Sequence, residues 1–593
     1  MSSVGASPQA TQDEGLRDAV IRLAGNSQDG IQTVGGMLGK LAGRTAQEVM
    51  TYMTIPSTIS GGPSIFQVHL GSGEVLHAGD EADVLVAFYQ HSYDDHIGDL
   101  KDGGICLYDL DKVEQTKDQR GIHHLAVPFT SATVEAIGGT AKDRGKNIFV
   151  LGLLCSMFRL EKEKLVGIIE RQFGNKSEDI LRNCLNAFDA GFAFQTTDLR
   201  QFQFVPGEAG NSKRISSDGN TMMAFGLIAG GVRYGAGYPI TPWSSIMELL
   251  RRELPKYGGV FMQAEDELAA VGIALGVSYA GHLSVTGSSG PGLSLKSETI
   301  GYASMAELPL LVINVQRGGP STGLPTSVEQ SDLLQAIYGS HGDSPRIVLA
   351  PKNVEDCFYI SLEAAQIAKR YSCPVIILSD QALATRIEAF TEPNLEEHWI
   401  EPDLDLSERG EDFKPYPIDG LTQHAPPGTP MADGTYPKVT GLEHDEMGHP
   451  SGNPENHQKM TNKRRDKLVD LAAELPLPDV YREQDGEILL LGWGSTYGPI
   501  REACDRLRDK GLCASATHIR HLHPLPRGMD DLMARYEHIF VVEMNDHGLY
   551  GSGQLATILR AAYANPAIQS ICKTDGLAYR VSEIVDGVDQ LLA

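Results

Sequence analysis

Leu310-Leu311-Val312-Ile313-Asn314-Val315, followed by Gln316-Arg317-Gly318-Gly319-Pro320, is the stretch that indicates the fold most clearly. The first six residues read as a buried β-strand, and the glycines and proline after Arg317 end it. Similar strands are expected at 284–286, 346–349 and 374–378, with helices at 267–279 and 354–369. Strands that alternate with helices in this way predict a parallel α/β sheet.

The same alternation recurs on both sides of this region, so we expect an α/β protein with three parallel-sheet domains and an irregular linker. The expected parts are a polar leader at 1–14, a first domain at 15–205, a second domain at 215–390, the linker at 391–480 and a third domain at 485–593. Prolines, glycines and acidic residues crowd the linker. Its stretch 460–475, with Lys463, Arg464, Arg465 and Lys467, reads as a solvated helix.

Composition narrows the class of protein. The 593 residues include 77 acidic and 50 basic side chains, a formal net charge of −27, which disfavours nucleic acid and anionic membranes as partners. No apolar run approaches the roughly 20 residues that cross a bilayer, and the polar N-terminus does not resemble a signal peptide, so we expect a cytoplasmic protein. The eight cysteines form no C-x-x-C pair and are expected to be core thiols rather than ligands of iron–sulfur clusters or zinc.

The glycine-rich turn at 25–30 joins an expected strand at 19–24 to a helix at 31–42. It lacks the Lys and Ser or Thr of a phosphate-binding Walker loop, because Ile31 and Gln32 follow. A tight turn explains it, although a strand–loop–helix corner also offers backbone N–H groups to an anion.

Two segments of the second domain suit the binding of a carboxylate. Pro239 and Pro242 bracket Thr241, which holds its hydroxyl at a strand-to-helix corner, although a proline that opens a helix explains the same pattern. Arg317 is the one charged residue in 315–326 and follows a buried strand, where α/β folds bind anions. A structural salt bridge is the alternative for Arg317.

Two further segments offer different chemistry. Gln263-Ala264-Glu265-Asp266-Glu267 precedes a nearly uncharged helix. In one interpretation its carboxylates only complement the helix dipole. In the other, the Glu267 side chain also points into an apolar pocket. The loop 286–292 lets a ligand approach the backbone closely, or is simply a tight turn between strand and helix. The histidines at 444, 449, 521 and 523 do not have metal-ligand spacing, and no metal site is expected in this chain.

Taken together, Tyr238-Pro239-Ile240-Thr241-Pro242, 263–267, Ser288-Ser289-Gly290-Pro291-Gly292 and 316–323 resemble, in this order, the alpha subunit of 2-oxoacid:ferredoxin oxidoreductases. The resemblance continues through 441–446, 463–464, 542–545 and 553–555. The first domain resembles the gamma domain of that family, fused in front, and its Gly-Asn-Ser-Gln-Asp-Gly turn is most like the 2-oxoglutarate branch. The resemblance implies a gamma-type domain, a thiamine pyrimidine-binding domain and a transketolase C-terminal-like domain.

The resemblance also implies roles for single residues. Glu267 would contact the aminopyrimidine ring of thiamine diphosphate and favour its imino tautomer, and is the expected catalytic residue. Thr241, Arg317 and Thr326 would bind the substrate. The expected cofactor-binding residues are Tyr238, Pro239, Ile240, Glu267, Ser289 and Gly290.

By the same resemblance, thiamine diphosphate is shared with a beta subunit that carries the diphosphate and Mg²⁺ site and a [4Fe-4S] cluster. Coenzyme A is a substrate with a possible contact in the first domain, ferredoxin takes the electrons, and the assembly is a dimer of alpha–beta heterodimers. The expected reaction is oxidative decarboxylation of 2-oxoglutarate to succinyl-CoA, or its reverse. Pyruvate and branched-chain 2-oxoacids stay open as substrates, as does a non-catalytic scaffold subunit.

Overall fold

The computed structural model describes residues 15–54, 61–138, 145–196, 198–207, 213–432, 434 and 436–593, so the expected leader at 1–14 lies outside the described residues. The chain forms two compact units. The first runs to Ser216 and includes Glu388–Glu392, and the second combines Ser217–Ile387 with Pro393–Ala593. Among the described helices, none combines the length and the apolar character needed to cross a bilayer.

The first unit contains an eight-stranded sheet in the order β6-β5-β4-β1-β3-β2-β14-β7. Its strands are β1 (Asp18–Asn26), β2 (Glu48–Met53), β3 (Pro63–Gly71), β4 (Ala82–Ala87), β5 (Leu100–Asp109), β6 (His123–Val127), β7 (Arg214–Asp218) and β14 (Ile387–Thr391). β1, β4, β5 and β6 pair in parallel. β3 pairs antiparallel with β1 and β2, and β2 with β14, so this sheet is mixed rather than purely parallel.

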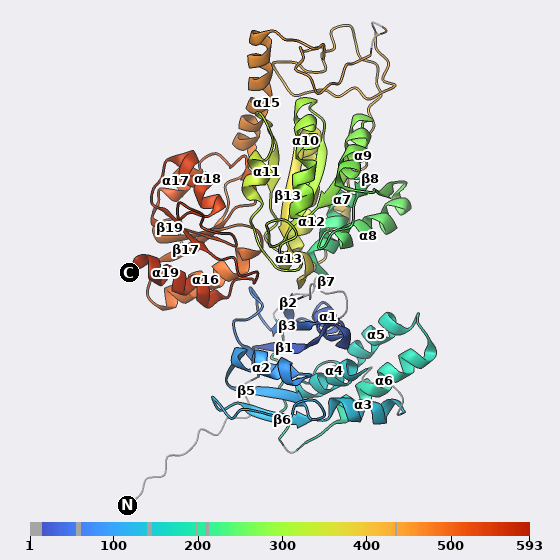
Figure 1. The fold of residues 1–593 in the computed structure, drawn as a ribbon, viewed down its shortest axis with the longest axis vertical. Helices are drawn as coiled ribbons and strands as arrows, with labels where there is room; N and C mark the ends of the chain where they lie inside the picture. The colour runs from blue at the N-terminus through green and yellow to red at the C-terminus, as the bar shows by residue number, and fades with distance from the viewer. Residues whose placement is uncertain are drawn as a thin grey trace, which may run out of the picture. The chain divides into compact units, whose positions relative to one another are not determined.

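Six helices accompany this sheet: α1 (Ile31–Ala42), α2 (Gln90–His96), α3 (Phe129–Ile137), α4 (Lys146–Met157), α5 (Lys162–Phe173) and α6 (Glu178–Ala193). α1 has the bounds expected from the sequence. α3, α4, α5 and α6 pack together as one group (Figure 1). α4 is buried along nearly its whole length, because α6 covers it.

The second unit contains two sheets. The larger has the order β18-β12-β13-β11-β10-β8-β9. Its strands are β8 (Tyr234–Gly237), β9 (Val260–Gln263), β10 (Ser284–Ser288), β11 (Leu310–Gln316), β12 (Ile347–Leu349), β13 (Pro374–Asp380) and β18 (His521–His523). All of these pairs are parallel except that of β18, which adds to β12 antiparallel although it comes from the expected third domain.

The smaller sheet has the order β15-β17-β16-β19-β20 and is parallel apart from β15. Its strands are β15 (Val480–Tyr481), β16 (Gly486–Gly492), β17 (Ala514–His518), β19 (Tyr536–Glu543) and β20 (Ile568–Cys572). The two sheets share one hydrophobic core, in which Val312 and Ile376 of the larger sheet join Leu489, Trp493 and Val541. The α/β class expected from the sequence is thus confirmed for all three sheets.

The helices of the second unit are α7 (Gly219–Ala229), α8 (Ser244–Glu253), α9 (Glu267–Tyr279), α10 (Gly290–Met305), α11 (Leu333–Tyr338), α12 (Val354–Tyr371), α13 (Gln381–Thr385), α14 (Leu395–His398), α15 (Pro454–Glu474), α16 (Tyr497–Asp509), α17 (Met529–Met533), α18 (Gln554–Tyr563) and α19 (Val581–Leu592). α9 begins and ends at the expected residues. In Figure 1 it stands beside α10, and the two helices pack against each other.

The expectation that α15 is a solvated helix is wrong. Lys463 and Lys467 are buried and both form ion pairs with the fully buried Glu307, at 2.5 and 3.0 Å. Arg464 is also buried and pairs with Glu443, so that only Arg465 of the four basic residues faces solvent. Lys463 and Lys467 therefore connect the linker helix to the sheet domain through Glu307, whereas Arg464 pairs with a residue of the linker itself.

Candidate functional site

Four neighbouring parallel strands bring the sequence motifs to one edge of the larger sheet. Gly237 of β8 lies opposite both Gln263 of β9 and Gly287 of β10, and Ser288 of β10 lies opposite Asn314 of β11. The segments 238–242, 264–267, 289–292 and 317–326 follow these strands and leave the sheet at the same edge. In α/β sheets this carboxyl edge is where ligands bind.

Glu267 opens α9 and is buried, with 7% of its surface exposed. Asp266, not Glu267, caps the helix, because its side chain accepts the Ala269 N–H at 2.7 Å. This leaves the Glu267 carboxyl available for another role. Gly292, in the first turn of α10, makes room for it, since a Cβ there would overlap Ser288 Oγ and come within 2.9 Å of Glu267 Cγ.

Several polar side-chain atoms at this edge are buried and lack hydrogen-bond partners among the described residues. They lie at the carboxyl ends of β10, β11 and β13 or directly after them: Thr286 Oγ1, Ser288 Oγ, Ser289 Oγ, Asn314 Oδ1, Arg317 Nε and Ser379 Oγ. A buried polar atom without a partner costs about 1–3 kcal/mol. A concentration of such atoms at one edge therefore indicates a ligand that supplies the missing hydrogen bonds.

The two residues expected to bind a carboxylate lie together. Arg317 Nη1 donates a 2.7 Å hydrogen bond to the backbone carbonyl of Thr241, whose side chain is exposed. Arg317 is 6% exposed, and burial lowers the pKa of its guanidinium, an effect that the nearby Asp332 opposes. The cation is thus held at the strand edge without an ion-pair partner among the described residues.

Tyr238, Pro239 and Ile240 form the strand-to-loop corner beside Thr241. Tyr238 and Pro239 are exposed and Ile240 is half-buried, which suits them to line a ligand rather than the core. Trp243 lies fully buried behind this corner, where the missing side chain of Gly287 leaves room for its ring. Packing of the Trp243 ring against Gly287 therefore supports this corner.

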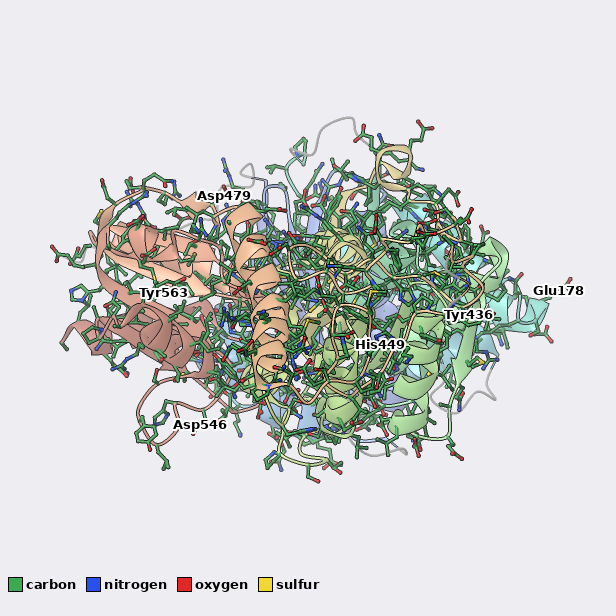
Figure 2. All side chains as sticks on the ribbon, turned by 90° about the horizontal axis from the view of Figure 1, so that it is seen from above. Glu178, Tyr436, His449, Asp479, Asp546 and Tyr563 are labelled. Atoms are coloured by element: carbon green, nitrogen blue, oxygen red, sulfur yellow. The ribbon has the colours of Figure 1, made fainter. Side chains whose placement is uncertain are left out.

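A cleft of about 1260 Å³ opens beside Arg317. Its lining includes Gly290, Pro291 and Arg317 from the part of the chain that forms the larger sheet. It also includes Asp546, Tyr550 and Arg560 from the part that forms the smaller sheet. Asp546 begins a loop that projects from the chain (Figure 2), and its neighbours Leu549 and Tyr550 are more than nine-tenths exposed. Glu267 and the half-buried Thr326 are not among the residues that line this cleft.

Asp332 is a cleft residue that the sequence analysis did not identify. The surrounding protein desolvates its carboxyl and raises its pKa, with a further rise from Glu329, while the Asn314 amide and Arg317 oppose the shift. Its only sequence signal was its place after the Arg317 loop, at the start of α11. Asn314 was likewise missed, because a polar residue in an apolar strand was read as part of the strand.

These residues suit a nitrogen heterocycle together with a small carboxylic acid. A carboxyl at Glu267 can exchange a proton with a ring nitrogen, the orphaned hydroxyls can bond to polar ring atoms, and Arg317 can hold a carboxylate. No group of three or more histidines, cysteines or acidic residues placed to hold a metal ion occurs in the described ranges. The thiamine pyrimidine ring expected here fits the residues present, because Glu267 and the hydroxyls without partners can bond to its nitrogen atoms.

Three family models match successive parts of the chain. "Pyruvate ferredoxin/flavodoxin oxidoreductase" matches residues 20–194, "Pyruvate flavodoxin/ferredoxin oxidoreductase, thiamine diP-bdg" matches 225–463, and "Pyruvate:ferredoxin oxidoreductase core domain II" matches 486–584. The middle match contains Glu267, Thr241 and Arg317.

Relatives align with nearly the whole chain. The 2-oxoglutarate oxidoreductase subunit KorA of Mycobacterium tuberculosis is 39% identical, over 96% of this chain and 91% of its own length. The 2-oxoacid:ferredoxin oxidoreductase 1 subunit alpha of Aeropyrum pernix is 29% identical, over 96% and 97%. A solved 2-oxoglutarate:ferredoxin oxidoreductase from Magnetococcus marinus, with 2-oxoglutarate, coenzyme A and succinyl-CoA bound, is 34% identical with a TM-score of 0.88, covering 98% of this chain and 100% of that one.

Proposed function

The chain belongs to the family of 2-oxoacid:ferredoxin oxidoreductase alpha subunits, and from this premise we propose that it acts in the conversion of 2-oxoglutarate and coenzyme A to succinyl-CoA and carbon dioxide, with reduction of ferredoxin. The observation that carries the proposal is that one edge of the larger sheet brings these groups together. Buried Glu267 lies at the same edge as hydroxyl groups that lack hydrogen-bond partners among the described residues, and Arg317 is hydrogen-bonded to the backbone of Thr241. Relatives and a solved structure named for 2-oxoglutarate favour that substrate over pyruvate and branched-chain 2-oxoacids.

Thiamine diphosphate, when bound, supplies the electron sink that makes decarboxylation of a 2-oxoacid feasible. Glu267 would hold or release a proton at its carboxyl oxygen toward a pyrimidine nitrogen. Ser289 and Gly290 line the same edge, and Tyr238, Pro239 and Ile240 form the corner that would hold the ring. Arg317 and the Thr241 hydroxyl hold the carboxylate that is lost, and Thr326 lies in the loop that follows Arg317.

A partner subunit is part of the proposal. Three large apolar residues close in sequence to Glu267 or to Gly292 are exposed. They are Leu268 on α9 at 54%, Met262 on β9 at 43% and Leu295 on α10 at 49%. Exposed apolar residues near a site support the proposal of a protein interface there. A beta subunit seated there would supply the diphosphate and Mg²⁺ site and the [4Fe-4S] cluster, and would pass electrons to ferredoxin in a dimer of alpha–beta heterodimers in the cytoplasm.

The proposal also includes a contact between coenzyme A and the first domain, 15–205. The glycine-rich turn there ends at Gly30 in a left-handed conformation, and a small pocket of about 290 Å³ beside it is lined by Asn26, Gln28, Gly62 and His91. His91 Nε2 is buried without a hydrogen-bond partner among the described residues. These groups suit the polar end of a pantetheine or nucleotide.

The test is an assay of the chain purified with its partner subunit. We expect coenzyme A-dependent reduction of a viologen dye with 2-oxoglutarate, and a loss of at least 100-fold in Glu267→Gln. Rates across a panel of 2-oxoacids separate 2-oxoglutarate from pyruvate and branched-chain substrates. Absence of activity with every 2-oxoacid would reject the enzyme, and full activity in Glu267→Gln would favour a scaffold role for this chain.

A further inference from the structure

Lys296 is a charged residue in the interior of the second unit to which the proposed reaction gives no role. It lies on α10, where it faces α9, and its side chain is completely buried. Its Nζ donates one hydrogen bond, 3.2 Å long, to the backbone carbonyl of Glu267. An ammonium has three donors, and no carboxylate of the described residues forms an ion pair with this one.

Packing alone does not explain a lysine at this position. Most of the other buried residues of the two helices are apolar, among them Ala270, Val271 and Leu293. Burial lowers the pKa of Lys296 to about 8, and the charges of Glu267 and Asp266 only partly oppose that shift. A methionine of similar length would fill the same space without the cost of a desolvated charge.

The position of the ammonium suggests what the charge does. The carbonyl that it contacts belongs to the residue whose side chain is the expected catalytic acid, in the first turn of α9. A hydrogen bond at that carbonyl fixes the backbone from which the carboxyl projects. The positive charge also acts on the carboxylate, because the buried Lys296 side chain lies where a charge is screened less than in water.

We propose that Lys296 is a positioning residue for Glu267, which holds the first turn of α9 against α10 and keeps a positive charge behind the carboxylate. The inference rests on the proposed function, because it assumes that Glu267 faces a thiamine ring nitrogen. One proton moves between the Glu267 carboxyl oxygen and that nitrogen, and Lys296 itself neither gains nor loses one. A fixed cation beside the carboxylate stabilises the side of this transfer on which the proton sits on the ring.

The experiment uses the chain purified with its partner subunit and measures the rate at which the thiamine C2 proton exchanges with solvent deuterium. Lys296→Met should slow this exchange at least 10-fold, leave the KM for the 2-oxoacid within about twofold, and not lower the thermal midpoint. Lys296→Arg keeps the charge and should retain most of the exchange rate. The matched control is Lys369→Met, an exposed lysine that also donates to a backbone carbonyl, that of Asp403.

The outcomes separate the two proposals. Unchanged C2 exchange in folded Lys296→Met, while Glu267→Gln abolishes it, overturns the role of Lys296 and leaves the proposed function standing. Unchanged exchange in Glu267→Gln overturns the proposed site itself. A Lys296→Met chain that unfolds or loses stability also overturns the inference, because it shows that the lysine is needed for packing.

Discussion

The Arg317 guanidinium donates a 2.7 Å hydrogen bond to the backbone carbonyl of Thr241, and so joins the loop after β11 to the loop after β8. The hydrogen bond uses Nη1, while Nε is buried with no partner among the described residues. One edge of the guanidinium is thus committed to the protein and another is left for a ligand. A guanidinium with two parallel donors matches a carboxylate, which a lysine ammonium does not.

We therefore expect Arg317→Lys to raise the KM for the 2-oxoacid about 10- to 100-fold, because hydrogen bonds to charged groups contribute about 1.5–3 kcal/mol. The thiamine C2 exchange rate should stay within twofold, since the change lies on the substrate side. Steady-state kinetics on the complex measure the first and isotope exchange the second. Arg370→Lys, at an exposed pair with Glu474, serves as the control, and an unchanged KM in Arg317→Lys would show that Arg317 is structural.

The buried ion cluster on α15 makes a prediction about acid stability. Burial raises the pKa of Glu307, but the charges and hydrogen bonds of Lys467 and Lys463 outweigh it and bring that pKa to about 2. A folded-state pKa below the unfolded value of 4.5 means that this carboxylate stabilises the protein above pH 4.5. The contribution should disappear as pH falls from 4.5 towards 2.

Glu307→Gln tests the same cluster at neutral pH. It leaves two buried ammonium groups without their counter-charge, and breaking a buried pair typically costs about 3–5 kcal/mol. Urea unfolding at pH 7 should show that loss. The loss should be smaller at pH 3, because the unfolded carboxyl is protonated there and the wild type has already lost part of the stability that the pair contributes. Glu253→Gln, which removes ion pairs with the exposed Arg252 and Lys256, should change stability by less than about 1 kcal/mol. Equal effects of the two substitutions would contradict the role of the cluster.

The sequence predicts some elements of the fold better than others. α9 was predicted with its bounds because acidic residues at 265–267 precede an uninterrupted apolar stretch, a local signal. The exposure of α15 was predicted wrongly, because its lysines are paired with Glu307, which is 156 positions from Lys463 along the chain. β18 could not be assigned to the larger sheet from sequence, since its partner β12 is also remote along the chain and β18 has only three residues.

The site follows the same rule. Glu267, Thr241 and Arg317 were proposed from local motifs, and the hydrogen bond from Arg317 to the Thr241 carbonyl places the last two next to each other. Asp332, Asn314 and Lys296 were missed because each gains its meaning from a neighbour on another strand or helix. A buried lysine in particular has no local signature, as a lysine within a helix is usually read as solvent-facing.

Gln330 connects the end of the Arg317 loop to the smaller sheet. Its Nε2 donates to the Trp493 carbonyl at 2.7 Å, its Oε1 accepts the Met544 N–H at 3.1 Å, and its backbone N–H donates to the Met544 carbonyl. Gln330→Leu removes both side-chain bonds and leaves the buried Met544 N–H without an acceptor, while the Trp493 carbonyl keeps its hydrogen bond from the Thr496 hydroxyl. We expect a loss of about 1–3 kcal/mol in urea unfolding and a raised KM for the 2-oxoacid. Gln458→Leu, which removes an exposed bond to Asn462, should leave both values unchanged, and a similar result for Gln330→Leu would show that the junction is not needed.

Lys296→Met should make the protein more stable at neutral pH, while it slows activation of the cofactor. Burial lowers the pKa of Lys296 in the folded state to about 8, against 10.5 in the unfolded chain, so the unfolded state binds more protons between these values and stability rises with pH across that window. Below pH 8 the folded protein carries the whole penalty, about 3 kcal/mol at most at about 1.4 kcal/mol per pKa unit, less about 1 kcal/mol for the hydrogen bond to the Glu267 carbonyl. Urea unfolding at pH 7 should therefore show a gain of about 1–2 kcal/mol in Lys296→Met, and the gain should shrink by pH 10, where the wild-type lysine is largely neutral in the folded state. A loss of stability at pH 7 would mean that the ammonium is bound more tightly than its single hydrogen bond indicates, and the lysine would then be a structural residue rather than one held in the interior for the sake of Glu267.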